Sequence, residues 1–260
     1  MSPVDVVHDL SGPDGAPVVV LAGSLGSTRA MWDPQLPTLA QHHRVLRVEH
    51  RGHGGSPAPP GPYAVAELAG DVLALLDRLG VARAAFCGLS LGGMVGVWLA
   101  AHAPERVAAL VLCCTTAHFP DPVPWHDRAA AVRGAGTASI APTVVGRWFT
   151  PSWSASHPEI PAGALEMISS VDDEGYAACC EAIAAWDGRD LLGSITAPTL
   201  VLAGTEDPAT PATPHAELLA AGIPGARLEL LEGAHLATVE QAGRATALIA
   251  DFIGEHAAGS

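Results

Sequence analysis

A serine flanked by glycines carries the strongest chemical signal in this chain. Residues 85–93 read AFCGLSLGG, an apolar strand that runs into Gly-x-Ser-x-Gly and then into a helix. A nucleophile on such a strand-to-helix turn has a strained backbone that crowds its neighbours, which explains the small residues on both sides. Its hydroxyl would lie at the N-terminus of the helix, where the helix dipole and free N–H groups favour a developing oxyanion. The pattern predicts that Ser90 is a nucleophile, and the alternative is an ordinary helix N-cap.

Two later loops supply the partners that a serine nucleophile needs. Asp207 follows the apolar strand 199–203, and His235 follows the strand 227–231. Serine is a poor nucleophile until a base takes its proton, and the imidazole of His235 can be that base near neutral pH. Asp207 would hold this imidazole in one tautomer and stabilise the imidazolium form. The order of the three residues predicts a Ser-His-Asp triad and weakens the N-cap interpretation, with Glu206 as an alternative to Asp207.

An oxyanion hole requires two N–H groups beside the nucleophile. The residue directly after the serine supplies one of them in this kind of turn, which points to the N–H of Leu91. The second is expected from the loop 23–26, which follows the apolar strand 18–22, and we assign it to Ser24. Loss of one such donor typically costs about 3 kcal/mol of transition-state stabilisation.

The segments that must position these residues alternate between strand and helix. Short apolar runs bounded by turn residues predict strands at 18–22, 45–49, 84–87, 107–112, 199–203 and 227–231. Apolar residues at helical spacing, followed by stop signals, predict helices at 65–79, 91–102 and 241–253. This alternation predicts an α/β fold, with a mostly parallel sheet flanked by helices on both faces.

The alternation stops in the stretch 119–189. This stretch has no strong strand pattern and holds four of the six tryptophans, together with Pro-rich and Ala-rich runs. Short helices are expected near 128–133, 162–169 and 177–186. We therefore predict a core formed by 1–118 and 190–260, and a helical cap, 119–189, inserted late in the chain over the active site.

Composition narrows the chemistry further. The chain has 260 residues, 49% of them hydrophobic and 15% charged, which suits one large domain with a sizeable core. Its net charge of -14 argues against nucleic acid or an anionic membrane as a partner. All 13 basic residues are arginine, so Schiff-base, pyridoxal and P-loop lysine chemistry is excluded.

The remaining cofactor and compartment signals are weak. Five cysteines form two adjacent pairs and a singleton, which fits buried thiols in a reducing cytoplasm better than disulfides. His50 and His53 share a turn without a matching acid or cysteine cluster, so no metal is expected. The first ten residues lack the basic and apolar regions of a signal peptide, and no apolar run is long enough to span a membrane.

The residues described above make the chain resemble the α/β-hydrolase superfamily and, more narrowly, the 3-oxoadipate enol-lactonases. The resemblance rests on GLSLGG at 88–93 with Asp207 and His235, and it extends over nearly the whole chain, the cap included. Further matching stretches are AGSLG at 22–26, MWDPQ at 31–35, FCGLSLGGMVG at 86–96, RWFTP at 147–151, GYAACC at 175–180, and AHL at 234–236 before VEQ at 239–241. Two positions depart from common superfamily patterns. Many members have histidine at the position of Ala22, whereas the lactonase group has alanine there, as this chain does. Glu49 stands where an aspartate is usual, and it is expected to have a structural role.

The resemblance implies a substrate and a reaction. The substrate is 3-oxoadipate enol-lactone of the β-ketoadipate pathway of aromatic catabolism, a small lactone that carries a carboxylate. Ser90 would open the ring, and water activated by His235 would release 3-oxoadipate without a cofactor. Some bacteria fuse such a hydrolase to a decarboxylase, and the chain is either the free-standing enzyme or one part of such a product.

A substrate carboxylate in so acidic a protein requires a local cation. We expect Arg133 of the cap to bind it, with Arg128, Arg147 and Arg189 as further candidates. The alternative for each arginine is an ion pair with a surface acid.

The residues that line the expected active-site pocket should distinguish between related activities. Trp125 and Trp148 are expected to supply apolar walls, and the alternative is that they fill the interior of the cap. A carboxylesterase, a carbon–carbon bond hydrolase and a cofactor-free haloperoxidase share the triad, so only the cap favours the lactonase. A ligand receptor with the hydrolase fold is an alternative of another class.

Overall fold

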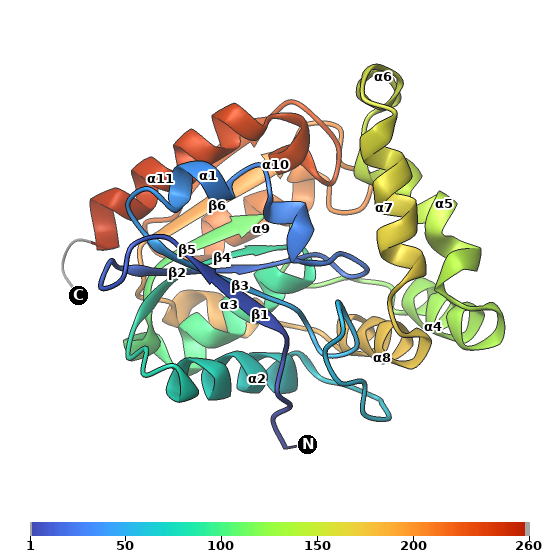
Figure 1. The fold of residues 1–260 in the computed structure, drawn as a ribbon, viewed down its shortest axis with the longest axis horizontal. Helices are drawn as coiled ribbons and strands as arrows, with labels where there is room; N and C mark the ends of the chain where they lie inside the picture. Colours follow the sequence, from blue (N-terminus) through green and yellow to red (C-terminus); the bar gives the residue numbers. More distant parts are fainter. Residues whose placement is uncertain (1, 258–260) are drawn as a thin grey trace.

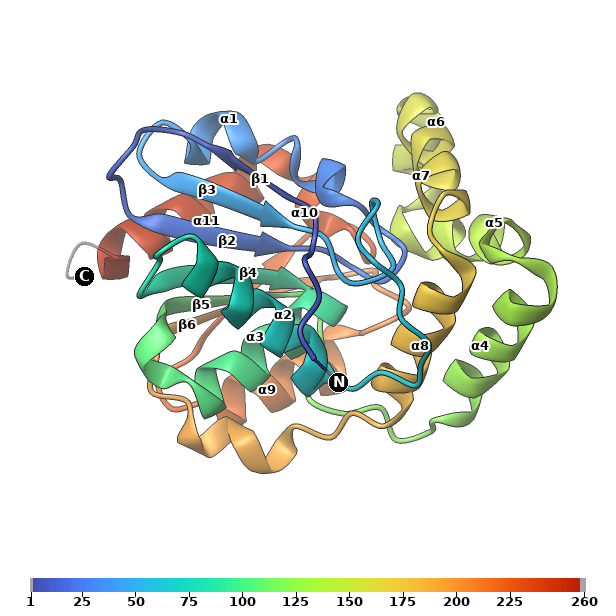
Figure 2. The same cartoon turned by 60° about the horizontal axis from the view of Figure 1, so that its bottom comes forward.

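A single sheet crosses the centre of the molecule (Figures 1 and 2). The computed structural model describes residues 2–257, and the strands in this range have the order β1-β3-β2-β4-β5-β6-β7. They are β1 (His8–Ser11), β2 (Val18–Ala22), β3 (Arg44–Val48), β4 (Ala84–Leu89), β5 (Val107–Cys113), β6 (Thr199–Gly204) and β7 (Arg227–Leu231). Strand β1 pairs antiparallel with β3, and every other pairing is parallel. The predicted α/β fold with a mostly parallel sheet is confirmed.

Helices cover both faces of this sheet. Those on one face are α1 (Leu36–Leu39), α10 (Ala237–Glu240) and α11 (Ala242–Ala257), and those on the other are α2 (Val65–Arg78), α3 (Leu91–His102) and α9 (Glu217–Gly222). Alternate residues of β2 supply both layers, since Val19 and Leu21 pack in one apolar cluster and Val20 and Ala22 in the other. Burial on both sides explains why the strands read as continuous apolar runs. Within residues 2–257 no helix is both long and apolar enough to cross a membrane.

Five α-helices follow β5 and precede β6, and we call them the cap helices. They are α4 (Val123–Ala135), α5 (Thr137–Trp148), α6 (Pro151–Ser156), α7 (Glu159–Ser169) and α8 (Asp173–Ala184). Figures 1 and 2 show them gathered beyond the carboxyl ends of the strands. The predicted short helices overlap α4, α7 and α8, whereas α5 and α6 were not predicted. Pro142 lies inside α5 and disfavours a helix there. The buried side chains of Val144 and Val145 support the helical conformation of α5.

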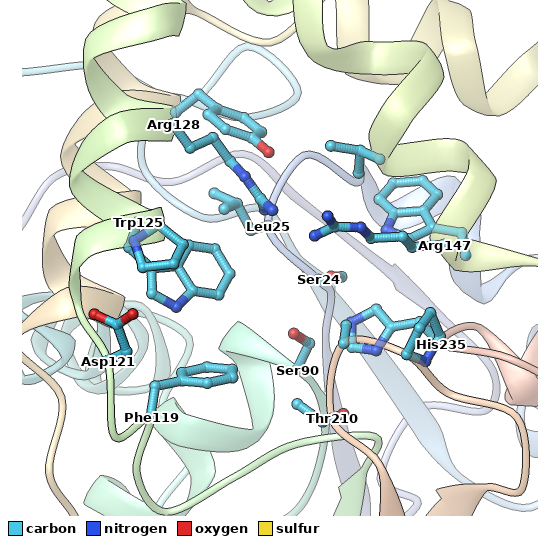
Figure 3. Close-up of a pocket in the computed structure, with 16 residues that line it drawn as sticks. Ser24, Leu25, Ser90, Phe119, Asp121, Trp125, Arg128, Arg147, Thr210 and His235 are labelled. Carbon is cyan, nitrogen blue, oxygen red and sulfur yellow. The ribbon is translucent and has the colours of Figure 1, made fainter.

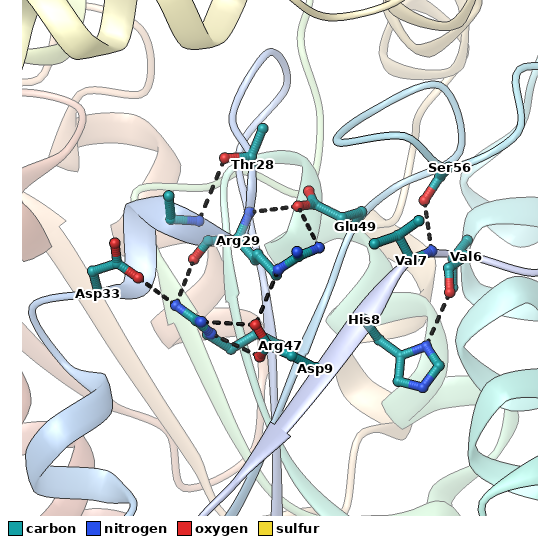
Figure 4. Close-up of polar contacts among 11 residues, drawn as sticks. Val6, Val7, His8, Asp9, Thr28, Arg29, Asp33, Arg47, Glu49 and Ser56 are labelled. Atoms are coloured by element: carbon teal, nitrogen blue, oxygen red, sulfur yellow. Dashed lines mark hydrogen bonds and ion pairs between the residues drawn. The ribbon is translucent and has the colours of Figure 1, made fainter.

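An arginine on β3 holds the antiparallel edge of the sheet in place (Figure 4). The Arg47 guanidinium donates to both carboxylate oxygens of Asp9 on β1, at 2.9 and 2.7 Å, and to Asp33 at 2.5 Å. Buried Glu49 accepts the backbone N–H of Arg29 at 3.0 Å. These contacts tie β1, the end of β3 and the segment after β2 together, so Glu49 has the structural surroundings expected for it.

Candidate active site

Ser90 occupies a strained turn between β4 and α3. Its backbone has φ 55° and ψ -111°, a conformation that L-residues rarely adopt. Its N–H donates to the carbonyl of Cys113 at 2.9 Å, and the hydroxyl of Thr115 donates to its carbonyl at 2.6 Å. A side chain at Gly88 would collide with the backbone of the first turn of α3, and one at Gly92 would collide with the Ala22 carbonyl. Both glycines of the motif are therefore required by close backbone approach.

Asp207 and His235 meet at the ends of β6 and β7. Nδ1 of His235 lies 2.9 Å from Oδ2 of Asp207, and both side chains are buried. Burial opposes ionisation of Asp207, but the contact with His235 and hydrogen bonds from Thr210 outweigh it and lower the pKa of Asp207 to about 2. A carboxylate at this position accepts a hydrogen bond from Nδ1–H, which keeps the proton on Nδ1 and leaves Nε2 able to act as a base. Glu206, the alternative acid, is exposed.

The loop that carries His235 is fastened to the cap. The carboxylate of Glu240 accepts the N–H of Ala234 at 2.7 Å and the hydroxyl of Thr150 at 2.7 Å. The N–H of Leu236 donates to the carbonyl of Trp148 at 2.8 Å. The end of α5 and the start of α6 therefore help to set the position of His235.

A cavity of about 190 Å³ lies between the sheet and the cap helices (Figure 3). Its lining includes the predicted residues Ser24, Ser90, Trp125, Trp148 and His235, and, among residues not singled out before, Leu25, Phe119, Tyr176 and Thr210. Ser90 and His235 face the cavity from the sheet, while Arg128 and Arg147 reach it from the cap. The structure thus brings the candidate nucleophile, base and two cations to one small space.

The two arginines of the cavity differ from the other arginines of the cap. Within residues 2–257, neither Arg128 nor Arg147 forms an ion pair, and Figure 3 shows their guanidinium groups directed into the cavity from opposite sides. Arg128 lies over the ring of Trp125, 4.6 Å from its centroid. The hydroxyl of buried Tyr176 lies beside Arg128 without a hydrogen bond of good geometry, and burial raises the pKa of this phenol. Together these groups place two guanidinium groups and a phenol hydroxyl at the cavity, and such groups can donate hydrogen bonds to an anion.

The prediction for Arg133 is corrected by the structure. Its guanidinium donates to Glu174 at 2.7 Å and to Glu181 at 2.6 Å, and it does not line the cavity. Five residues along an ideal helix correspond to a rotation of about 140°, so Arg128 and Arg133 face different sides of α4. Arg128 is three residues after Trp125 and shares its face, which is the signal that favours it over Arg133. Arg189 is also paired, with Asp187.

The two expected oxyanion donors lie on neighbouring backbone segments. Leu91 begins α3, where N–H groups have no acceptor within the helix. The N–H of Ser24 contacts Sδ of Met31 at 3.4 Å, and a thioether is a weak acceptor that a developing oxyanion can displace. The N–H of Gly92 donates to the carbonyl of Gly23 at 3.0 Å, which fixes the two segments against each other.

The side chains considered for metals and redox chemistry have other surroundings. In the described part of the chain, no group of three or more His, Cys, Asp or Glu side chains is placed to hold a metal ion. His50 and His53 are buried and hydrogen-bonded to backbone groups. All five cysteines are free and buried.

Comparisons with known proteins agree with the fold. The family model for the alpha/beta hydrolase fold matches residues 16–147. 3-Oxoadipate enol-lactonase 2 of Acinetobacter baylyi is 40% identical over 230 residues, which cover 88% of this chain and 86% of that protein. The crystal structure of the enol-lactonase from Burkholderia xenovorans LB400 matches with a TM-score of 0.94 and 41% identity, covering 96% of both chains. A putative carbamate hydrolase, RutD of Stutzerimonas stutzeri, is 32% identical over 259 residues and is also covered over 96% of both chains.

Proposed function

Because this chain belongs to the α/β-hydrolase superfamily and to its 3-oxoadipate enol-lactonase family, we propose that it opens 3-oxoadipate enol-lactone to 3-oxoadipate. The observation that carries the proposal is the cavity itself. It joins Ser90 and the His235–Asp207 pair to two arginines that form no ion pair with any carboxylate of the described residues. A small ester with an anionic arm matches both halves of this cavity.

Ring opening is the first half of the reaction. The hydroxyl oxygen of Ser90 attacks the lactone carbonyl while Nε2 of His235 takes the hydroxyl proton. The negative charge on the carbonyl oxygen is stabilised by the N–H groups of Leu91 and Ser24. The bond between the acyl carbon and the ring oxygen then breaks, and the leaving enolate takes the proton held on Nε2 of His235 to give an enol, which tautomerises to the ketone. Asp207 stabilises the imidazolium that forms in between.

Hydrolysis of the acyl-enzyme is the second half. The acyl group stays attached to Ser90 through an ester bond while its keto-acid arm remains in the cavity. His235 removes a proton from water, and the resulting hydroxide attacks the ester carbonyl. The bond to Ser90 breaks, the serine oxygen regains a proton from His235, and 3-oxoadipate leaves. The residues of this chain supply every proton transfer, so the proposed cycle uses no cofactor.

The carboxylate of the substrate is held by the cap. Arg128 is half-buried against Trp125 and donates hydrogen bonds in a fixed plane that suits a carboxylate. Arg147 adds a second positive charge, and Trp125 and Trp148 give the cavity its apolar walls. Within the proposal the partner is a small carboxylated lactone, not a nucleic acid or a membrane, and the buried free thiols support a cytoplasmic location.

The substrate is tested by a coupled assay on enol-lactone generated in situ from muconolactone or 4-carboxymuconolactone. Loss of ultraviolet absorbance is followed for the wild type and for Ser90→Ala. We expect rapid loss with the wild type and none above background with the variant. A wild type that leaves the lactone intact but turns over simple esters through Ser90 would retain the triad mechanism and refute the substrate.

A carbamate hydrolase is the second candidate, because a relative of that name covers nearly the whole chain at 32% identity. Turnover of a simple carbamate, followed by the ammonia released, separates the two candidates, since the guanidinium pair favours a substrate with a carboxylate arm. A ligand receptor with this fold would release at most one equivalent of product from an activated ester, whereas repeated turnover identifies an enzyme.

A further inference from the structure

Two buried histidines in the turn after β3 contact the loop that carries Ser24. Nε2 of His50 donates to the carbonyl of Gly23 at 2.9 Å. Nε2 of His53 accepts the N–H of Gly26 at 2.9 Å. The two imidazoles thus hold the carbonyl directly before Ser24 and the N–H two residues after it.

The contact of His50 acts on the same peptide unit as the expected oxyanion donor. The carbonyl of Gly23 and the N–H of Ser24 belong to one planar trans peptide, so they point in opposite directions. This carbonyl accepts two hydrogen bonds, from Nε2 of His50 and from the N–H of Gly92 at 3.0 Å. Two donors on one oxygen fix the peptide plane, and with it the direction of the Ser24 N–H. The weak Met31 sulfur that this N–H meets would not fix it alone.

Both histidines carry out these contacts as neutral rings. Nδ1 of His53 lies 3.1 Å from the carbonyl of Arg51, so a neutral His53 donates there and accepts at Nε2. Burial and the neighbouring His50 lower the pKa of His53 to about 3, and burial also lowers the pKa of His50. The ring of His53 stacks on Tyr176 of α8, with centroids 6.5 Å apart. The pair therefore links the cap to the loop beside the nucleophile.

We propose that His50 and His53 are positioning residues of the oxyanion hole: His50 aims the Ser24 N–H at the substrate's carbonyl oxygen, and His53 anchors the far end of the loop. The inference rests on the proposed role of Ser24 as a donor. It does not depend on which ester or lactone is the substrate, because every acyl transfer through Ser90 passes through the same oxyanion.

The test compares His50→Phe, which keeps a ring but loses the donor, with His50→Gln, which keeps an N–H donor. Hydrolysis of p-nitrophenyl acetate is measured per titrated active site, together with inhibition by an alkylboronic acid that forms a tetrahedral adduct on Ser90. In His50→Phe we expect kcat to fall by about 10- to 100-fold with KM nearly unchanged, since the contact acts in the transition state. Affinity for the boronic acid should fall in parallel, and His50→Gln should recover most of both.

The matched control is His102→Phe, an exposed histidine on α3 outside the cavity, which should change neither quantity. A folded His50→Phe with unchanged kcat and boronic acid affinity overturns the inference, and so does a rise in KM alone. If His50→Phe does not fold, His50→Met supplies a second side chain without a donor. A wild type that cleaves the activated ester but not the enol-lactone refutes the proposed substrate and leaves this test intact.

Discussion

Removal of a single guanidinium group should separate binding of the substrate's carboxylate from the chemistry of the triad. Arg128→Met keeps an apolar stem of similar length beside Trp125 and removes the charge. A hydrogen bond to a charged group contributes about 1.5–3 kcal/mol, which corresponds to a loss of roughly 10- to 150-fold in kcat/KM. The half-buried position of Arg128 and its contact with Trp125 place it within this range. Arg147 is exposed to solvent, so Arg147→Met should cost no more than about 1 kcal/mol, or roughly fivefold.

The assay uses two substrates that differ only in the charged arm. One is 3-oxoadipate enol-lactone, and the other is α-angelica lactone, the same unsaturated ring with a methyl group in place of the carboxymethyl arm. We expect Arg128→Met to lose activity on the first and to change activity on the second by less than about threefold, because only the first has a partner for the charge. The loss on the carboxylated lactone should appear mainly in KM if the carboxylate is bound equally in the ground state and the transition state.

Arg133→Met is the matched control, since Arg133 lies on the same helix and is paired with Glu174 and Glu181 outside the cavity. It should leave kcat/KM on both lactones unchanged and reduce stability only slightly, as expected for partly exposed ion pairs. Equal losses on both lactones in Arg128→Met would refute the reasoning, because they would show damage to the site as a whole. A loss in Arg133→Met with none in Arg128→Met would restore the prediction made from the sequence.

Three further predictions concern the triad, its turn and a cap helix. Asp207→Asn should lower kcat by about 10⁴-fold. The pKa of Asp207 is lowered to about 2 in the folded protein, so its ionised form stabilises the fold fully above about pH 4. This stabilisation is lost as the pH falls toward 2. Urea unfolding of both proteins across this window should therefore show a shrinking difference in free energy of unfolding, and a constant difference contradicts the pKa. Gly92→Ala should reduce the melting temperature and the yield of active sites, because the new methyl group meets the Ala22 carbonyl. Gly134→Ala in α4 has open space and should stabilise the protein by about 0.5–1 kcal/mol, so a loss of stability there would contradict the geometry of the cap.

The parts of the site that the sequence predicted are those fixed by local patterns. The turn at Ser90 follows from a strand, closely spaced glycines and a helix within a few residues, and no distant contact is needed to identify it. Asp207 and His235 each follow an apolar strand, and the carboxyl ends of parallel strands meet at one edge of a sheet. Six of the strands are visible as apolar runs for the same reason. β1 (His8–Ser11) is half-buried and contains two polar residues and a histidine, so its antiparallel pairing with β3 left no periodic signal.

The parts that the sequence did not predict depend on contacts across the fold. The choice between Arg128 and Arg133 is decided by which side of α4 faces the cavity and by the acidic residues of α8, and neither is visible in α4 alone. Helix α5 contains Pro142 and two consecutive valines, so its helical state relies on tertiary packing. The contacts of His50 and His53 with the Ser24 loop join residues 27 positions apart in both cases. From the sequence these histidines were considered only as metal ligands. Their spacing gives no information about contacts with the loop 23–26.

The strongly acidic composition and an anionic substrate are compatible once distance is considered. At physiological ionic strength the Debye length is about 8 Å, so acidic groups on remote surfaces are largely screened from the cavity. A carboxylate bound in the cavity as proposed would lie close to Arg128 and Arg147, and the attraction of one such pair at about 4 Å and an effective dielectric constant of 20 is about 4 kcal/mol before desolvation. The other cap arginines are neutralised by acids, as Arg133 is by Glu174 and Glu181. The local charge at the site therefore depends on the arginines that lack a partner and on Asp121, which also lines the cavity, and the net charge of -14 does not predict it.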